Sequence, residues 1–177
     1  MKPWWIIAAV VIVAVVVIGV RLMGNRPSET PTAQVNMPVA TAPADTANAQ
    51  TAFLTENVKK PGWKATDSGL QYMVEKAGDP GAPHPAPGSE VTVNYEGRLI
   101  DGTIFDSSYA RNEPATFPLS GVIQGWQEGV PMMRQGEIWE FAIPSKLAYG
   151  DRQVGPIPAG STLLFKIELL NVKTPAP

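Results

Sequence analysis

The chain has 177 residues, which is enough for one domain with additional segments, and a formal net charge of −2. It contains no cysteine, so disulfide bonds, thiolate metal sites and a cysteine nucleophile are excluded. This charge balance makes no electrostatic case for nucleic acid as a partner. The single histidine, His84, lies in a proline-rich stretch and cannot alone build a zinc cluster, so no metal or cofactor is predicted.

The first predicted element is a membrane anchor. Residues 3–20 carry no charge, and a helix of these 18 residues would rise roughly 27 Å, close to the thickness of a bilayer's hydrocarbon core. Trp4 and Trp5 lie where interfacial aromatic residues hold the end of a spanning helix. A cleaved signal peptide is the alternative, although its apolar core is usually shorter and this run exits into Arg21 rather than into small residues. We expect residues 1–26 to form an uncleaved transmembrane signal-anchor.

A tether and a short helix are expected next. Residues 27–51 contain four prolines and few large apolar side chains, too few to offset the entropy of ordering, so a disordered linker is predicted. Residues 52–62 include AFLTENVKK, whose pattern predicts a brief lead-in helix stopped at Pro61-Gly62. The folded domain is then expected to cover residues 63–177.

From Trp63 onward apolar and polar residues alternate with a period of two, which predicts β-strands. The clearest is the strand at 91–99, which carries Tyr95 on its apolar side. The other predicted strands are 70–75, 104–106, 138–143 and 162–170. Asp101-Gly102 predicts a two-residue hairpin turn between two of them.

One short helix is predicted within the domain, over residues 122–130. Ile123, Trp126 and Val130 share one face of it. Pro131 ends it, because proline lacks an N–H and its ring crowds the preceding turn. Several antiparallel strands and one short helix predict an α+β fold, in which a curled antiparallel sheet, a half-barrel, wraps on the helix.

Four segments between residues 89 and 172 resemble, in order and in spacing, the FKBP-type peptidyl-prolyl cis-trans isomerases. They are VTVNYEGRLIDGTIFDSS, EPATFPLSGVIQGWQEGV, IPSKLAYG and IPAGSTLLFKIELL. Each motif alone is weak, whereas the ordered set is specific. Upstream, AFLTENVKKPGWKATDSGLQYMV is similar to the lead-in of the bacterial macrophage-infectivity-potentiator branch. The resemblance implies a half-barrel with an apolar pocket between sheet and helix, which works without metal or cofactor.

The same resemblance implies a site, position by position. Trp126 would be the floor under a substrate proline ring, and the backbone N–H of Ile123 would hold a substrate carbonyl. The implied catalytic residues are Tyr95, Phe105, Asp106, Trp126, Tyr149 and Phe165. The implied substrate-binding residues are Phe117, Val122, Ile123, Ile157 and Arg111. The alternatives are a charge-paired Asp106 that only fixes a loop, and a purely packing role for Phe117 and Phe165.

The activity implied by the resemblance is rotation about Xaa-Pro bonds in unfolded or exported polypeptides, with binding of the family's macrolide inhibitors. Ala115 stands where many relatives carry a larger residue, and Gly155-Pro156 where relatives more often show Pro-Gly. The pocket wall and the flap loop are therefore expected to depart from the family pattern. A module that holds unfolded chains with little turnover, or an adaptor for one membrane partner, is the alternative function.

The location follows from the anchor and the bacterial resemblance. Lys2 and the terminal amine stand before the apolar run and Arg21 and Arg26 after it, so the flanking charges are nearly balanced. A short-tailed N-terminal anchor usually inserts with its N-terminus in the cytoplasm. We therefore expect a single pass through the inner membrane, with the domain in the periplasm.

Overall fold

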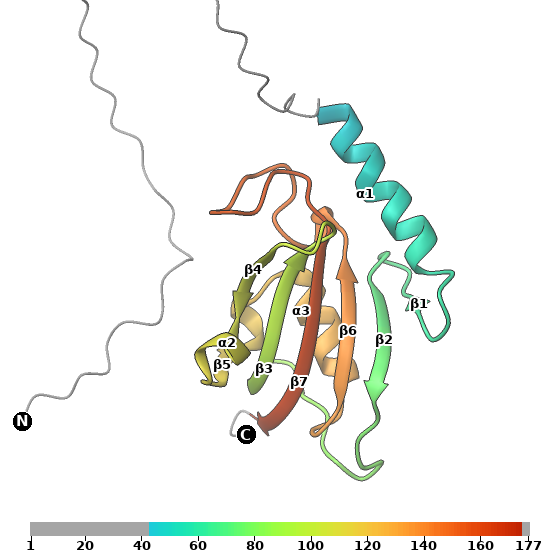
Figure 1. Ribbon diagram of the computed structural model, residues 1–177. Coiled ribbons are helices and arrows are strands. Elements are labelled where there is room, and N and C mark those ends of the chain that lie inside the picture. Colours follow the sequence, from blue (N-terminus) through green and yellow to red (C-terminus); the bar gives the residue numbers. More distant parts are fainter. Residues whose placement is uncertain (1–42, 175–177) are drawn as a thin grey trace, which may run out of the picture. The chain divides into compact units, whose positions relative to one another are not determined.

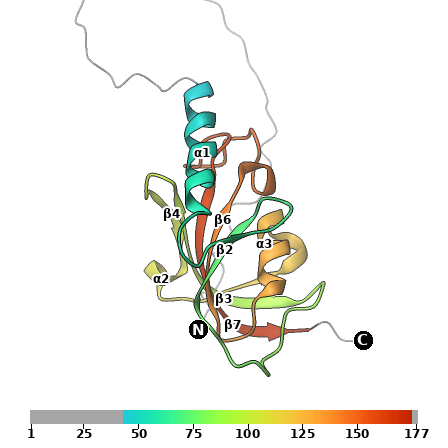
Figure 2. The same ribbon diagram turned by 90° about the vertical axis from the view of Figure 1, so that its right-hand side faces the viewer.

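The computed structural model of the protein describes residues 43–174, which form one antiparallel sheet with short helices (Figure 1). In chain order the elements are α1 (Pro43–Asn57), β1 (Lys64–Ala65), β2 (Gln71–Lys76), β3 (Glu90–Leu99), β4 (Ile104–Ser107), α2 (Ser108–Arg111), β5 (Ala115–Pro118), η1 (Leu119–Gly121), α3 (Gln124–Gly129), η2 (Val130–Met132), β6 (Ile138–Ile143), η3 (Ser145–Leu147) and β7 (Leu163–Lys173). The seven strands follow the order β1-β2-β6-β7-β3-β4, and β5 also pairs with β3. Figure 2 shows α3 against one face of the sheet, as predicted.

The two long strands β3 and β7 show why a period-two sequence forms this sheet. Val91, Val93 and Tyr95 of β3 are buried, while the residues between them are only partly buried. β7 alternates in the same way, and the two strands pair antiparallel from Leu99 opposite Leu163 to the far end. The strands predicted at β3, β6 and β7 are therefore confirmed, with β7 extending a few residues beyond its predicted end.

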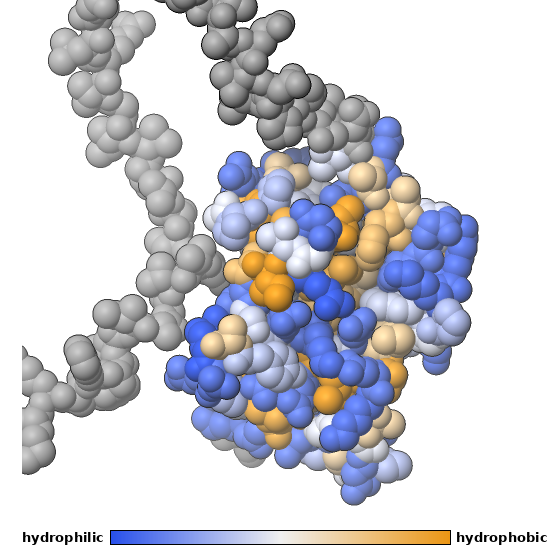
Figure 3. Space-filling view, in the orientation of Figure 1, coloured by the Kyte–Doolittle hydropathy of each residue, from blue (hydrophilic) through white to orange (hydrophobic). Residues whose placement is uncertain are grey.

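The other side chains of the sheet meet solvent and pair with each other. The Arg98 guanidinium lies 3.3 Å from the Glu140 carboxylate, and the Lys166 amine lies 2.7 Å from that of Glu75. The face of the molecule seen in Figure 3 is mostly hydrophilic, with hydrophobic side chains only in small separate patches. The core therefore lies on the α3 side of the sheet.

Two glycines let the backbone of α3 lie directly on the sheet. A Cβ atom at Gly125 would stand 2.5 Å from Cγ2 of Ile143, and one at Gly129 would stand 2.5 Å from Cε1 of Phe141. The α-helix ends at Gly129, before Pro131, as predicted, and the chain continues as the 3₁₀ turn η2. Trp126 thereby points into the core from a short and closely seated helix.

The helix α1 differs from its prediction at both ends. It begins at Pro43, inside the stretch 27–51 that was predicted to be disordered, and it ends at Asn57 instead of continuing to the predicted stop at Pro61-Gly62. Residues 44–49 include three alanines, the best helix formers, and proline is tolerated in a helix's first turn. The prolines earlier in the linker do not affect this segment, so averaging over the whole stretch hid a helical sequence.

The hairpin between β3 and β4 has a three-residue loop, so the predicted two-residue turn is wrong. The Leu99 N–H donates to the Thr103 carbonyl at 2.9 Å, and the Gly102 N–H donates to the Leu99 carbonyl at 3.0 Å. Gly102 has φ +88°, the left-handed conformation that closes three-residue hairpins. The Asp-Gly pair marked the turn correctly, but the loop begins one residue earlier, at Ile100.

The predicted anchor, residues 1–26, and most of the predicted linker lie outside the described residues. Between Pro43 and Thr174, no helix has both the length and the apolar character needed to cross a bilayer.

Candidate active site

Four aromatic rings meet at the centre of the α3 side of the sheet. The ring of Trp126 stands edge-on to Tyr95, Phe117 and Phe165, with centroid separations of 5.6, 5.8 and 5.3 Å. Phe105 extends the group, since its ring stands edge-on to that of Phe165 at 5.6 Å. We call these five residues the aromatic cluster.

Each ring of the aromatic cluster comes from a different element. Tyr95 and Phe165 occupy inward positions of β3 and β7, Phe117 lies on β5 and Phe105 on β4. Trp126 is only 5% exposed, whereas Phe105 and Phe117 are half-buried. The cluster therefore has an enclosed floor at Trp126 and a more open edge along β4 and β5.

Gly97 makes room for this arrangement. A Cβ atom there would lie 2.5 Å from Cε2 of Phe105 and 2.8 Å from Cε1 of Phe165. Because β3 alternates, Gly97 is the next inward position after Tyr95, where the sequence pattern alone predicts another apolar side chain. Nothing in the sequence around Gly97 indicates this role, which depends on the rings of Phe105 and Phe165 that face it.

A polar group stands at the open edge of the cluster, formed by Tyr95, Asp106 and Arg111. The Tyr95 hydroxyl donates to Oδ2 of Asp106, and Nη1 of Arg111 donates to Oδ1 of the same carboxylate. Nη2 of Arg111 donates to the Tyr95 hydroxyl at 3.1 Å. These bonds close a three-membered network that fixes the phenol and the carboxylate relative to each other.

The short helix α2 brings Arg111 back to Asp106. Oγ of Ser107 caps the helix by accepting from the Ala110 N–H at 3.2 Å, and Asn112 ends it with φ +53°. Within this turn Oγ of Ser108 accepts from the Tyr95 N–H at 2.8 Å and is fully buried. Ser108 thus holds the Tyr95 backbone, a role that sequence reasoning missed because its signal is a contact between distant elements.

The network shifts the pKa values of all three of its members. Burial and the bond to Asp106 raise the pKa of the Tyr95 phenol to about 12. Burial works against ionisation of Asp106, but the hydrogen bonds from Tyr95 and Arg111 outweigh it and lower the pKa of this carboxyl. The bond to Asp106 raises the pKa of the Arg111 guanidinium. Tyr95 is therefore neutral, and Asp106 and Arg111 are charged, over a wide range of pH.

The remaining predicted site residues lie in or against the hydrophobic core that also contains Tyr95, Trp126 and Phe165. Ile157 is buried in the core, and Val122, Ile123 and Tyr149 are half-buried against it. Burial, with Asp106 nearby, raises the pKa of the Tyr149 phenol. Among the hydrogen bonds of the described residues, none uses the N–H of Ile123, although its carbonyl accepts from the first turn of α3. The structure thus joins seven of the eleven predicted site residues in the aromatic cluster and its polar edge, and it places the other four in or against the same hydrophobic core.

Ala115 and His84, which the sequence also singled out, lie outside the aromatic cluster. Ala115 lies at the end of β5 opposite Val93 and packs on the core, where it contributes a small surface. Nδ1 of His84 lies 2.9 Å from the Met133 carbonyl, in a loop that is not part of the aromatic cluster.

Known families and relatives match this chain over both of its parts. The family described as "FKBP-type peptidyl-prolyl cis-trans isomerase" matches residues 81–170, and the "domain amino terminal to FKBP-type peptidyl-prolyl isomerase" matches residues 27–74. The peptidyl-prolyl cis-trans isomerase Mip of Coxiella burnetii is 54% identical over 123 residues, which are 69% of this chain and 53% of that protein. The FKBP-type 22 kDa peptidyl-prolyl cis-trans isomerase of Escherichia coli is 51% identical over 121 residues, 68% of this chain and 58% of that protein. The chain thus spans little more than half the length of these relatives.

Solved structures agree with the described fold. The crystal structure of FkpA from Escherichia coli superposes with a TM-score of 0.71 at 44% identity, over 76% of this chain and 62% of that one. A peptidyl-prolyl cis-trans isomerase from Pseudomonas syringae gives 0.69 at 36% identity, over 75% of this chain and 98% of that one.

Proposed function

The chain belongs to the FKBP-type peptidyl-prolyl cis-trans isomerase family, and from this we propose that its domain catalyses rotation about Xaa-Pro bonds in polypeptides. The observation that carries the proposal is the aromatic cluster around Trp126 with Tyr95, Asp106 and Arg111 at its edge. Five of the aromatic positions that the family resemblance implied make up this cluster, which supports the proposal.

The chemistry of the reaction explains why such a site suffices. Resonance holds an amide planar with a barrier of about 18–20 kcal/mol, and the planar amide has more charge separation than the twisted transition state. An apolar surround that removes water disfavours the planar form relative to the twisted one. The reaction makes and breaks no covalent bond, so no nucleophile is needed.

Each group at the site has a role in this proposal. The substrate proline ring lies over Trp126, with Phe105 and Phe165 as walls. The N–H of Ile123 donates to a substrate carbonyl, because no hydrogen bond of the described residues occupies it. Asp106 and Arg111 hold the Tyr95 phenol in a fixed orientation toward the twisted amide. Tyr149 and Ile157 cover the substrate from the side of the flap loop, the segment between η3 and β7.

The direct test is isomerisation of a short Xaa-Pro peptide by the purified chain. Uncatalysed isomerisation takes about 10–100 s at 25 °C, so acceleration is easily measured. We also propose that a family macrolide competes for the same site and abolishes the acceleration. A folded chain that gave no acceleration would overturn the proposal and favour a module that holds unfolded segments.

The rate of catalysis is expected to be flat from about pH 5 to pH 9, because no group of the network changes charge there. Because the pKa of Asp106 is lowered, this carboxyl stays ionised until the pH falls below the ordinary pKa of an aspartate. The raised pKa of Tyr95, about 12, keeps the phenol protonated on the alkaline side. A kcat/KM profile with a midpoint between pH 5 and pH 9 would contradict these assignments.

We further propose that residues 1–26 anchor the chain in the inner membrane, with the isomerase domain acting on exported proteins in the periplasm. The support is the uncharged run 3–20, which is long enough for a spanning helix. Alkaline phosphatase fused after Pro177 should be active, since it folds only outside the cytoplasm. An inactive fusion, together with an active cytoplasmic reporter at the same position, would overturn this topology.

A further inference from the structure

One side chain of the helix α1, that of Gln50, contacts the loop that precedes β7. Oε1 of Gln50 accepts a hydrogen bond from the backbone N–H of Thr162 at 2.8 Å, across 112 positions of sequence. Thr162 is the last residue before β7, and it ends the loop that carries Ile157. We propose that Gln50 is a positioning residue, which holds this loop, residues 150–162, in the conformation that the site requires. This inference rests on the proposed isomerase function.

The loop has hydrogen bonds at its tip and across its waist, and Gln50 supplies one at its base. At the tip, Val154 and Ile157 exchange two backbone hydrogen bonds of 3.0 and 2.9 Å. At the waist, the Gly160 N–H donates to the Gly150 carbonyl at 2.9 Å. No backbone acceptor of the described residues binds the Thr162 N–H, so the base depends on Gln50.

The position of Thr162 makes this bond consequential. Thr162 is only 1% exposed with Gln50 in place, so its N–H depends on the Gln50 amide and not on water for a partner. A buried donor without a partner is unfavourable, and the chain relieves it by moving the donor toward solvent. Thr162 lies between Ile157 and Phe165 in the sequence, so a movement of its backbone affects the chain on both sides. Both residues belong to the proposed site.

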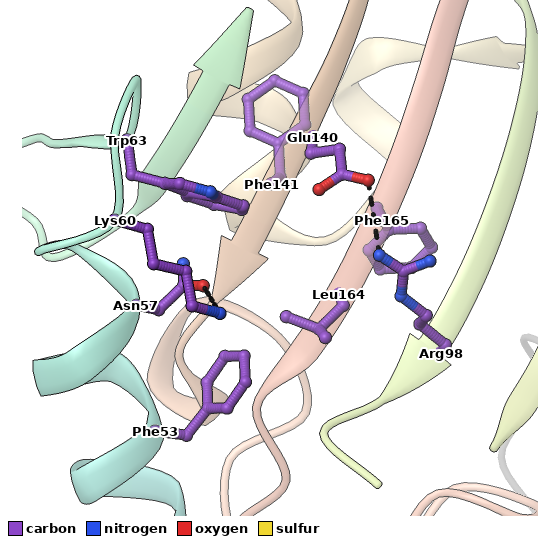
Figure 4. Close-up of a pocket in the computed structure, with 9 residues that line it drawn as sticks. All are labelled: Phe53, Asn57, Lys60, Trp63, Arg98, Glu140, Phe141, Leu164 and Phe165. Atoms are coloured by element: carbon purple, nitrogen blue, oxygen red, sulfur yellow. Dashed lines mark hydrogen bonds and ion pairs between the residues drawn. The ribbon is translucent and has the colours of Figure 1, made fainter. Parts of the chain in front are cut away.

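Hydrogen bonds also hold the C-terminal end of α1 to the sheet. A cavity of about 300 Å³ lies under the helix, lined by Phe53 and Asn57 of α1 and by Leu164 of β7 (Figure 4). At the C-terminal end of the helix, Nε2 of Gln71 donates to the Leu54 carbonyl at 2.8 Å, and Nδ2 of Asn57 donates to Oε1 of Gln71 at 3.0 Å. Removal of Gln50 therefore frees the loop while α1 stays attached at its other end.

The test compares Gln50→Ala with Asn48→Ala in the full chain. Asn48 is exposed on the same helix, and no side-chain hydrogen bond of the described residues involves it. In Gln50→Ala, amide hydrogen exchange in residues 157–162 should quicken by up to about tenfold, the value of one hydrogen bond. KM for an Xaa-Pro peptide should rise about threefold with kcat retained, because the loop contacts substrate in ground and transition states alike.

The second variant, Gln50→Glu, keeps an acceptor oxygen, so both the exchange rate and KM should return to the values of the parent chain. This recovery would show that the effects in Gln50→Ala come from the lost hydrogen bond and not from lost packing of the helix. Equal exchange in Gln50→Ala and Asn48→Ala would overturn the positioning role. Faster exchange with unchanged KM would overturn the link between this loop and catalysis. A parent chain without isomerase activity would refute the proposed function, and the exchange comparison would still decide whether Gln50 holds the loop.

Discussion

Replacing Gly129 with alanine is expected to lower the free energy of unfolding by about 1–3 kcal/mol, the usual effect of overpacking a core. The new methyl group would lie 2.5 Å from Cε1 of Phe141 and 3.1 Å from two further atoms of the same ring. Phe141 is 1% exposed and cannot turn away, so α3 must move off the sheet. Alanine's better helix propensity, up to about 1 kcal/mol, offsets part of this cost.

Urea denaturation of Gly129→Ala beside Gly121→Ala measures the effect. A Cβ atom at Gly121 meets only Cγ of Pro118, at an ordinary 3.4 Å, so this variant should stay within about 0.5 kcal/mol of the parent. Equal denaturation midpoints for the two variants would show that α3 is not held as closely to the sheet as Gly125 and Gly129 indicate.

The parts of the fold that could be predicted are those in which the residue pattern of a single segment indicates which side chains are buried. The alternation in β3 states directly which side chains face the core, and Tyr95 lies on the predicted side. The same holds for β7, with Phe165 inward. Pro131 likewise marks the end of α3 by its own chemistry, whatever surrounds it.

The parts that could not be predicted depend on contacts between distant segments. Gln71 is a polar residue of β2, yet it is only 6% exposed, and its amide donates to the Leu54 carbonyl at the end of α1. The sequence alone does not show why a glycine stands at position 97, because the reason is the close approach of the Phe105 and Phe165 rings. The reach of Gln50 to Thr162 has no local signal at all.

The candidate site falls between these two cases. A charge-paired Asp106 was one interpretation of the sequence, and the structure shows Arg111 as its partner. It also shows that the structural and the functional interpretations of Asp106 are compatible, since the pair that fixes the loop also orients the Tyr95 phenol. Ser108 was missed because only the fold brings it to the Tyr95 backbone.

Replacing Trp126 with leucine is expected to lower kcat/KM by about 10- to 100-fold. An aromatic contact is worth about 0.5–1.5 kcal/mol beyond its buried area, and 1.4 kcal/mol is tenfold in rate. The variant loses the floor under the substrate ring and also the edge-on contacts that align Tyr95 and Phe165. Both losses weaken binding of the twisted amide, so kcat should fall and not only KM rise.

Trp139→Leu is the matched control for this prediction. Trp139 is also a buried tryptophan, 7% exposed, and its indole N–H, like that of Trp126, has no partner among the described residues. Its ring stacks on Tyr72 at 5.0 Å and makes no ring contact with the aromatic cluster. Removing it should cost stability but leave kcat/KM per folded molecule within about threefold of the parent. Equal losses in the two variants would mean that Trp126 acts through packing alone, and the site assignment would then be wrong.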